Sequence, residues 1–172
     1  AAVSTDHNVT LSGGLKNMPY RATVGYTNQQ GILKTSKFER LTASLNLSPS
    51  LLEDHLKINL NAKGMIAKTR YANTSAVNAA VWMDPTQSIY DSRDEYKNFG
   101  GYFQWTSNGA ALNDPNWPLT YNTLATKNPV ALLDQQDDNA TSKTFIGNAE
   151  FDYKVHGFED LRLHMNLGAD YS

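Results

Sequence analysis

Six stretches of this sequence alternate apolar and polar residues one by one, and this alternation limits the possible folds more than any other feature. In residues 56–64, leucine, isoleucine, alanine and glycine alternate with lysine and asparagine. A β-strand points successive side chains to opposite faces, so each stretch predicts a strand with one apolar and one polar face. We expect strands at about 7–13, 20–28, 38–48, 55–69, 143–155 and 160–172.

The connections between the expected strands are of two kinds. Three are short and rich in Gly, Pro, Asp and Ser, which predicts tight turns at 14–19, 48–54 and 156–160. Two are longer: a loop at 29–36 and an excursion from about 70 to 142. Within the excursion, Thr74 or Ser75 can begin a short helix through Met83, and Asn128-Pro129 can begin another through Gln136.

Composition excludes several classes of protein. The chain has 172 residues, one domain's worth, with 15 Lys and Arg against 17 Asp and Glu. The net charge is -2 and there is no basic run, so the sequence does not indicate a positively charged surface for binding nucleic acid. Because there is no Cys, disulfides, thiolate metal sites and a Cys nucleophile are excluded. No apolar run approaches the ~18 residues of a membrane helix.

Two all-β folds fit this pattern, a soluble sandwich and a membrane β-barrel. Alternation by itself favours the commoner soluble sandwich. The length of the strands and the segregation of short turns and long loops at opposite ends favour an outer-membrane barrel. The barrel's polar face would line a hydrated lumen, and its apolar face would contact the lipid bilayer. The expected lumen-lining residues are Arg40, Lys57, Lys63, Glu150, Asp152, Arg162 and His164.

An ordered series of short segments resembles the start of the barrel in SusC/RagA-type TonB-dependent outer-membrane transporters of Bacteroidetes. The segments are 20–33 (YRATVGYTNQQGIL), 36–40 (SKFER), 45–47 (LNL), 56–61 (LKINLN), 83–86 (MDPT), 89–91 (IYD), 128–130 (NPV) and 147–153 (GNAEFDY). Each is short, but their order is specific and spans nearly the whole chain.

The resemblance implies a fold and a function. The fold would be all-β: about six antiparallel strands of a large transmembrane β-barrel, with one long extracellular loop carrying short helices. Family members have a plug domain and about 22 strands, so residues 1–172 would be a partial barrel from the front of a larger chain. The implied function is import of oligosaccharides or peptides across the outer membrane of a Gram-negative bacterium. The implied partners are a SusD-like surface lipoprotein and TonB, contacted through other parts of the protein.

The polar residues do not form a recognised catalytic or metal-binding pattern. The four histidines, His7, His55, His156 and His164, lack the spacing of metal ligands. Glu150 and Asp152 share a strand face as a glycosidase pair could, but a polar lumen explains them without catalysis. We therefore expect a protein that is not an enzyme, with no catalytic residues, no metal and no cofactor.

The long loop holds ten of the eighteen aromatic residues, between Tyr71 and Tyr121. Aromatic rings interleaved with Asn and Asp suit sugar or peptide ligands. The candidate residues for binding a ligand or partner are Tyr96, Phe99, Tyr102, Trp105 and Trp117. A long loop can equally use its rings as its own small core, and the sequence leaves both readings open. An alternative function, a secreted carbohydrate-binding β-sandwich, would use the same rings directly.

Overall fold

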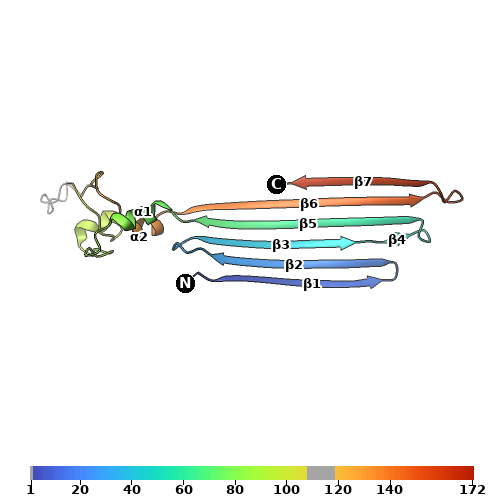
Figure 1. The fold of residues 1–172 in the computed structure, drawn as a ribbon, viewed down its shortest axis with the longest axis horizontal. Helices are drawn as coiled ribbons and strands as arrows, with labels where there is room; N and C mark the ends of the chain where they lie inside the picture. The colour runs from blue at the N-terminus through green and yellow to red at the C-terminus, as the bar shows by residue number, and fades with distance from the viewer. Residues whose placement is uncertain (1, 108–118) are drawn as a thin grey trace. The chain divides into compact units, whose positions relative to one another are not determined.

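A computed structural model describes residues 2–107 and 119–172 of the chain. Its main feature is a single β-sheet in which the long strands follow the order β1-β2-β3-β5-β6-β7, with the short β4 paired to β5. Figure 1 shows these strands lying side by side. Their bounds are β1 Ser4–Leu15, β2 Met18–Gln30, β3 Lys37–Leu47, β4 Ser50–Leu51, β5 Leu56–Tyr71, β6 Asp138–Lys154 and β7 Arg162–Tyr171.

The chain forms two compact units. The sheet unit contains the residues up to Gly31, Lys37–Arg70 and Asn139–Ser172. The loop unit contains Ile32–Ser36 and Tyr71–Asp138. The loop unit holds three short helices: α1 Ser75–Trp82, the 3-10 helix η1 Asp94–Phe99 and α2 Pro129–Asp134. None of the helices in the described part of the chain has the length and apolar character needed to cross a bilayer.

The strand register assigns every residue of the sheet to a face. The pairs β1-β2, β2-β3, β3-β5 and β6-β7 are antiparallel. Leu11, Ala22, Leu45 and Ala62 lie opposite one another along four consecutive strands. Because side chains alternate along a strand, this row and every second row beside it lie on the same face. The alternation of the sequence thus becomes one continuous apolar face.

Several strands are longer than the alternation predicts. Strand β1 begins at Ser4 rather than 7, and β6 begins at Asp138 rather than 143. The added residues are polar on both faces, so they carry no alternating signal. In β1 they are held by backbone pairing, as in Asp6 with Thr27. The two-residue strand β4 falls inside the stretch expected to be a turn.

Candidate functional site

The apolar face of the sheet is exposed over its whole width in the described structure. Val9, Val24 and Leu45 leave 73%, 52% and 42% of their surface uncovered. The face continues into β6 and β7, since Leu60 and Ala62 line the same shallow depression as Ala149 and Leu167. A surface patch of this size on a monomer indicates contact with a partner or a membrane.

A polar belt bounds the apolar face at the sheet end where the two long connections begin. The register places Glu39 between Asn28 and Lys68 on the same face as Tyr26. The Tyr26 hydroxyl donates to Glu39 Oε1 at 3.2 Å, and Lys37 Nζ lies 2.8 Å from the same oxygen. The alternation within single strands does not reveal this belt, because it forms only where the ends of β2, β3 and β5 align. From the belt, the apolar rows run past Tyr20 to Met18 in β2 and to Leu56 in β5.

The opposite face carries all seven residues expected to line a lumen. Register and alternation place Arg40, Lys57 and Lys63 on it. Glu150, Asp152, Arg162 and His164 join them, because Ala149 and Leu167, which lie on the other face of β6 and β7, line the apolar depression with Leu60 and Ala62. Asp152 lies opposite His164, and its Oδ2 is 4.0 Å from Arg162 Nη1.

A hydrogen-bonded network crosses three strands of this polar face. Thr27 Oγ1, which is only 4% exposed, donates to Asp6 Oδ2 at 2.8 Å. Arg40 Nη2 donates to Thr27 Oγ1 at 3.4 Å, and Asn8 Nδ2 donates to Asp6 Oδ1 at 2.7 Å. Such cross-strand polar pairs fix the register of β1, β2 and β3.

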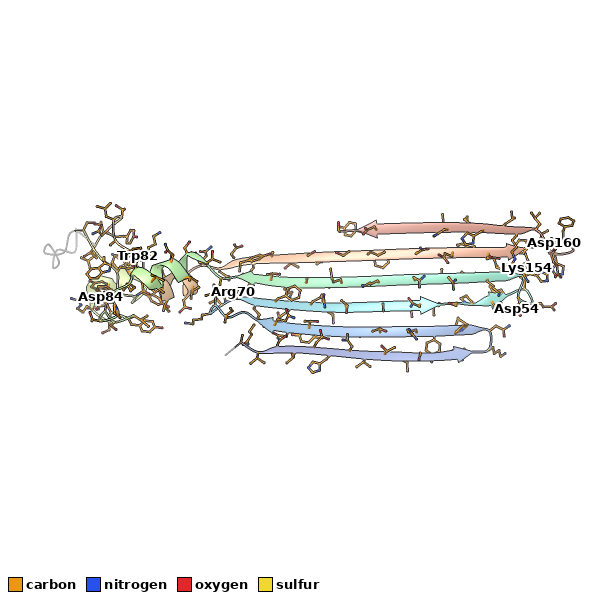
Figure 2. All side chains as sticks on the ribbon, in the orientation of Figure 1. Asp54, Arg70, Trp82, Asp84, Lys154 and Asp160 are labelled. Carbon is orange, nitrogen blue, oxygen red and sulfur yellow. The ribbon has the colours of Figure 1, made fainter. Side chains whose placement is uncertain are left out.

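The short connections gather at the other end of the sheet. Asp54, Lys154 and Asp160 mark this end in Figure 2. The rings of His55 and His156 lie 4.2 Å apart there. Residues 2–107 and 119–172 contain no group of three His, Asp or Glu side chains placed to hold a metal ion.

The loop unit is organised around Asn128, which is 1% exposed. As expected from the Asn128-Pro129 pair, its Oδ1 accepts from the backbone N–H groups of Val130 and Ala131 and caps α2. Its Nδ2 donates to the carbonyls of Ile89 at 2.8 Å and Phe103 at 3.0 Å. All four hydrogen-bonding positions of one amide are therefore used to join three segments.

The aromatic residues of the loop pack largely on one another. Tyr96 is buried, with its ring 5.9 Å from Phe99 and 6.0 Å from Phe103. Trp105 meets Phe103 edge to face at 5.2 Å. The Tyr102 ring lies 5.2 Å from that of Tyr90. Trp117, the fifth candidate, lies outside the described residues.

Tyr102 also belongs to a cluster of polar side chains centred on Asp134. The Tyr102 hydroxyl donates to Asp134 Oδ2 at 3.0 Å, and Lys34 Nζ lies 2.6 Å from the same oxygen. The hydrogen bond with this carboxylate raises the pKa of both Tyr102 and Lys34. Thr35 Oγ1 donates to Leu133 O at 3.3 Å, which adds a second link between residues 32–36 and α2.

A pocket of about 390 Å³ opens beside α2 in the loop unit. The polar and aromatic residues that line this α2 pocket are Phe99, Gln104, Tyr121, Lys127, Gln135 and Gln136. Only Phe99 was a candidate from the sequence. The glutamines carry no pattern that sequence reasoning could have used, because Gln104 lies about thirty residues before Gln135 and Gln136. A second exposed feature of this unit is Trp82 of α1, labelled in Figure 2, with 74% of its surface uncovered.

The chain is similar in sequence to two TonB-dependent receptors. Over 99% of its length the chain is 48% identical to the TonB-dependent receptor SusC of Bacteroides thetaiotaomicron, of which it covers 17%. It is 25% identical over 85% of its length to the TonB-dependent receptor P26 of Formosa agariphila, of which it covers 13%. No family model matches the chain.

The chain thus spans about one sixth of the length of the SusC protein that it matches. The match runs through both the sheet unit and the loop unit, because it covers 99% of the residues. The resemblance noted in the short sequence segments is confirmed: along nearly its whole length, this chain is similar to one segment of SusC-type TonB-dependent receptors.

Proposed function

We propose that residues 1–172 are part of the wall of a large β-barrel in an outer-membrane, TonB-dependent importer of oligosaccharides or peptides. The observation that carries this proposal is the division of one long-stranded sheet into a continuous apolar face and a polar face. Apart from the two-residue β4, its strands of 10 to 17 residues exceed the five or six that are common in soluble proteins. The 48% identity to a TonB-dependent receptor supports the same reading.

In this proposal the apolar face contacts lipid and the polar face lines the lumen. On β5 this face is apolar at every second residue from Leu56 to Ile66, ten residues apart (56 to 66), and the belt residue Lys68 follows on the same face. At about 3.4 Å per residue this is about 34 Å along the strand, and a tilt of about 45° reduces it to about 24 Å of height, close to the ~25 Å apolar band of outer-membrane barrels. The polar belt of Lys37, Glu39 and Lys68 would then lie at the headgroup level, where charged side chains are tolerated.

The loop unit would lie outside the cell, because long loops are extracellular in such barrels. We propose that it contributes to binding the substrate or a SusD-like surface lipoprotein. The packed rings of Tyr96, Phe99, Tyr102 and Trp105 would hold its shape, and Trp117 remains a candidate contact. TonB would be contacted through other parts of the protein.

The alternative of a secreted carbohydrate-binding sandwich has less support. A sandwich needs a second sheet against the apolar face. The described residues form one sheet, and large side chains such as Val9 and Met165 remain half or more exposed on it. No observation in the loop unit favours that alternative specifically.

Fractionation of the intact protein tests the proposal. Expressed in a Bacteroidetes host, it should enter the outer-membrane fraction, need detergent for extraction and show a heat-modifiable band on a gel. Uptake of its substrate should require TonB, and a surface lipoprotein should co-purify with it. A soluble monomer in the medium or the periplasm would contradict the proposal.

A further inference from the structure

The three glutamines of the α2 pocket have their amide orientations fixed by other groups. Gln104 Oε1 accepts from the backbone N–H of Asn128 at 3.1 Å, so Gln104 Nε2 is left as a donor. Gln135 Nε2 donates to the Phe99 carbonyl at 2.8 Å, which leaves its Oε1 as an acceptor. Neither backbone group can exchange its role, so neither amide can be flipped.

Gln136 is fixed by a chain of two hydrogen bonds. The backbone N–H of Ser75 donates to Asn73 Oδ1 at 3.0 Å, and this makes Asn73 Nδ2 a donor. Asn73 Nδ2 in turn donates to Gln136 Oε1 at 2.6 Å. Gln136 Nε2 is therefore a second amide donor among the residues that line the pocket.

Lys127 adds a positive charge to these donors. Its ammonium lies 5.5 Å from the centre of the Tyr121 ring, and in the part of the chain that the structure describes it forms no ion pair. The residues found to line the pocket include no carboxylate. Two amide donors, one ammonium and one amide acceptor form a site that is rich in donors and positive, which suits a ligand bearing a carboxylate and a hydroxyl.

We propose that the α2 pocket binds a hexuronic acid residue of an oligosaccharide. The carboxylate would pair with Lys127 and the amide donors, and a ring hydroxyl would donate to Gln135 Oε1. Phe99 and Leu132 provide apolar surface for the C–H face of a sugar ring. The volume lies within the range of roughly 300 to 1,000 Å³ for small-molecule sites. This inference deepens the proposed function and rests on it for its role in import.

Calorimetric titration of the intact protein in detergent tests the inference. The probes are trigalacturonate, a hyaluronan tetrasaccharide, neutral maltotriose and the peptide trialanine. At least one uronate probe should bind, and Lys127→Gln should weaken it about tenfold or more, the loss of one charge-assisted hydrogen bond. Lys127→Arg should retain most of the affinity. Maltotriose should bind more weakly than that uronate probe and be insensitive to Lys127→Gln.

Lys97→Gln is the matched control, because it removes the same charge from an exposed position of the loop unit. It should leave uronate binding unchanged, and both variants should show the heat-modifiable band of the folded protein. The inference is overturned if neither uronate probe binds, if Lys127→Gln has no effect, or if maltotriose or trialanine binds better than both uronate probes. If the protein resides in the outer membrane, any of these results overturns only the binding inference, and the proposed function stands. If the protein fails to reach the outer membrane, the proposed function is itself overturned.

Discussion

Lys34 and Asp134 are one hundred residues apart in the sequence, yet the Lys34 ammonium lies 2.6 Å from the Asp134 carboxylate. The contact joins the β2–β3 connection to α2 within the loop unit. Since Tyr102 donates to the same carboxylate, one acidic side chain links three segments. Asp134 is thus a structural organiser of the loop unit, although no sequence pattern singles it out.

Asp134→Asn should loosen the 32–36 segment. The substitution keeps the size of the side chain but removes the charge that pairs with Lys34. A spin label at Ile32, which is fully exposed, should become more mobile in the electron paramagnetic resonance spectrum. Asp94→Asn, which removes an exposed i,i+3 pair with Lys97, is the control and should leave the label unchanged. Equal mobility in all three proteins would contradict the role assigned to Asp134.

The same contact predicts a loss of order at high pH. Asp134 raises the pKa of Lys34 and Tyr102 above their usual values of about 10.4 and 10. A raised pKa stabilises the folded form below the ordinary value, and this contribution is lost as the pH rises through the raised pKa. The Ile32 label should therefore keep its mobility up to about pH 10 and gain mobility above it. A label already as mobile at pH 8 as at pH 11 would contradict this.

Acid should act on a different part of the loop unit. Arg93 donates to both carboxylate oxygens of Asp91 and lowers the pKa of Asp91. A lowered pKa stabilises the folded form above the usual value of about 3.9, and the contribution is lost as the pH falls through the lowered pKa. Amide exchange in residues 90–103 should accelerate when the pH falls below about 4, after correction for the intrinsic rate. In Asp91→Asn this acceleration should be reduced; an unchanged profile would contradict the role of the pair.

Asn128→Ala should destabilise the loop unit strongly. It removes the cap of α2 and leaves the carbonyls of Ile89 and Phe103 without their amide donor. The expected cost is about 2 to 4 kcal/mol from the lost cap and the unsatisfied buried groups. Amide exchange in residues 129–134 reports it. Asn98→Ala, at an exposed position, should have little effect, and similar protection in both variants would show that Asn128 does not organise the unit.

The sheet could be predicted from the sequence, because a strand with one apolar and one polar face shows alternating apolar and polar residues. Residues such as Leu45 and Leu60 give that signal at each second position. The polar ends of β1 and β6 could not be predicted, since Asp6 is held by pairing with Thr27 rather than by burial and the first residues of β6, from Asp138, are exposed on both faces. The polar belt at Glu39 could not be predicted either, because recognising it requires the alignment of three strands, and the sequence of one strand does not contain that information.

Less of the loop unit than of the sheet could be predicted from the sequence. The Asn128-Pro129 start of α2 has a local signal, because capping involves neighbours in sequence. The helix ends at Asp134 rather than at Gln136, and η1 has no comparable signal. The α2 pocket combines Gln104 with Lys127 and Gln135, and only the folded chain brings them together.

Arginine substitutions test the assignment of faces and its depth. Leu45→Arg, in the middle of the apolar rows, should cost roughly 2 to 4 kcal/mol for folding into lipid vesicles. Leu56→Arg should cost less, because Leu56 is the first residue of β5 and lies at the edge of the apolar rows. Ser44→Arg, on the polar face, should be mild. Equal costs at Leu45 and Ser44 would contradict the assignment.

The most direct test of the central claim, that the apolar face contacts lipid, is the accessibility of spin labels in the intact protein in membranes. Labels at Leu45 and Ser44, adjacent in β3, point to opposite faces of the sheet. We predict that the Leu45 label collides more often with oxygen, which concentrates in lipid, and that the Ser44 label collides more often with a water-soluble nickel complex. Equal accessibility at the two positions, or the reverse pattern, would contradict the account.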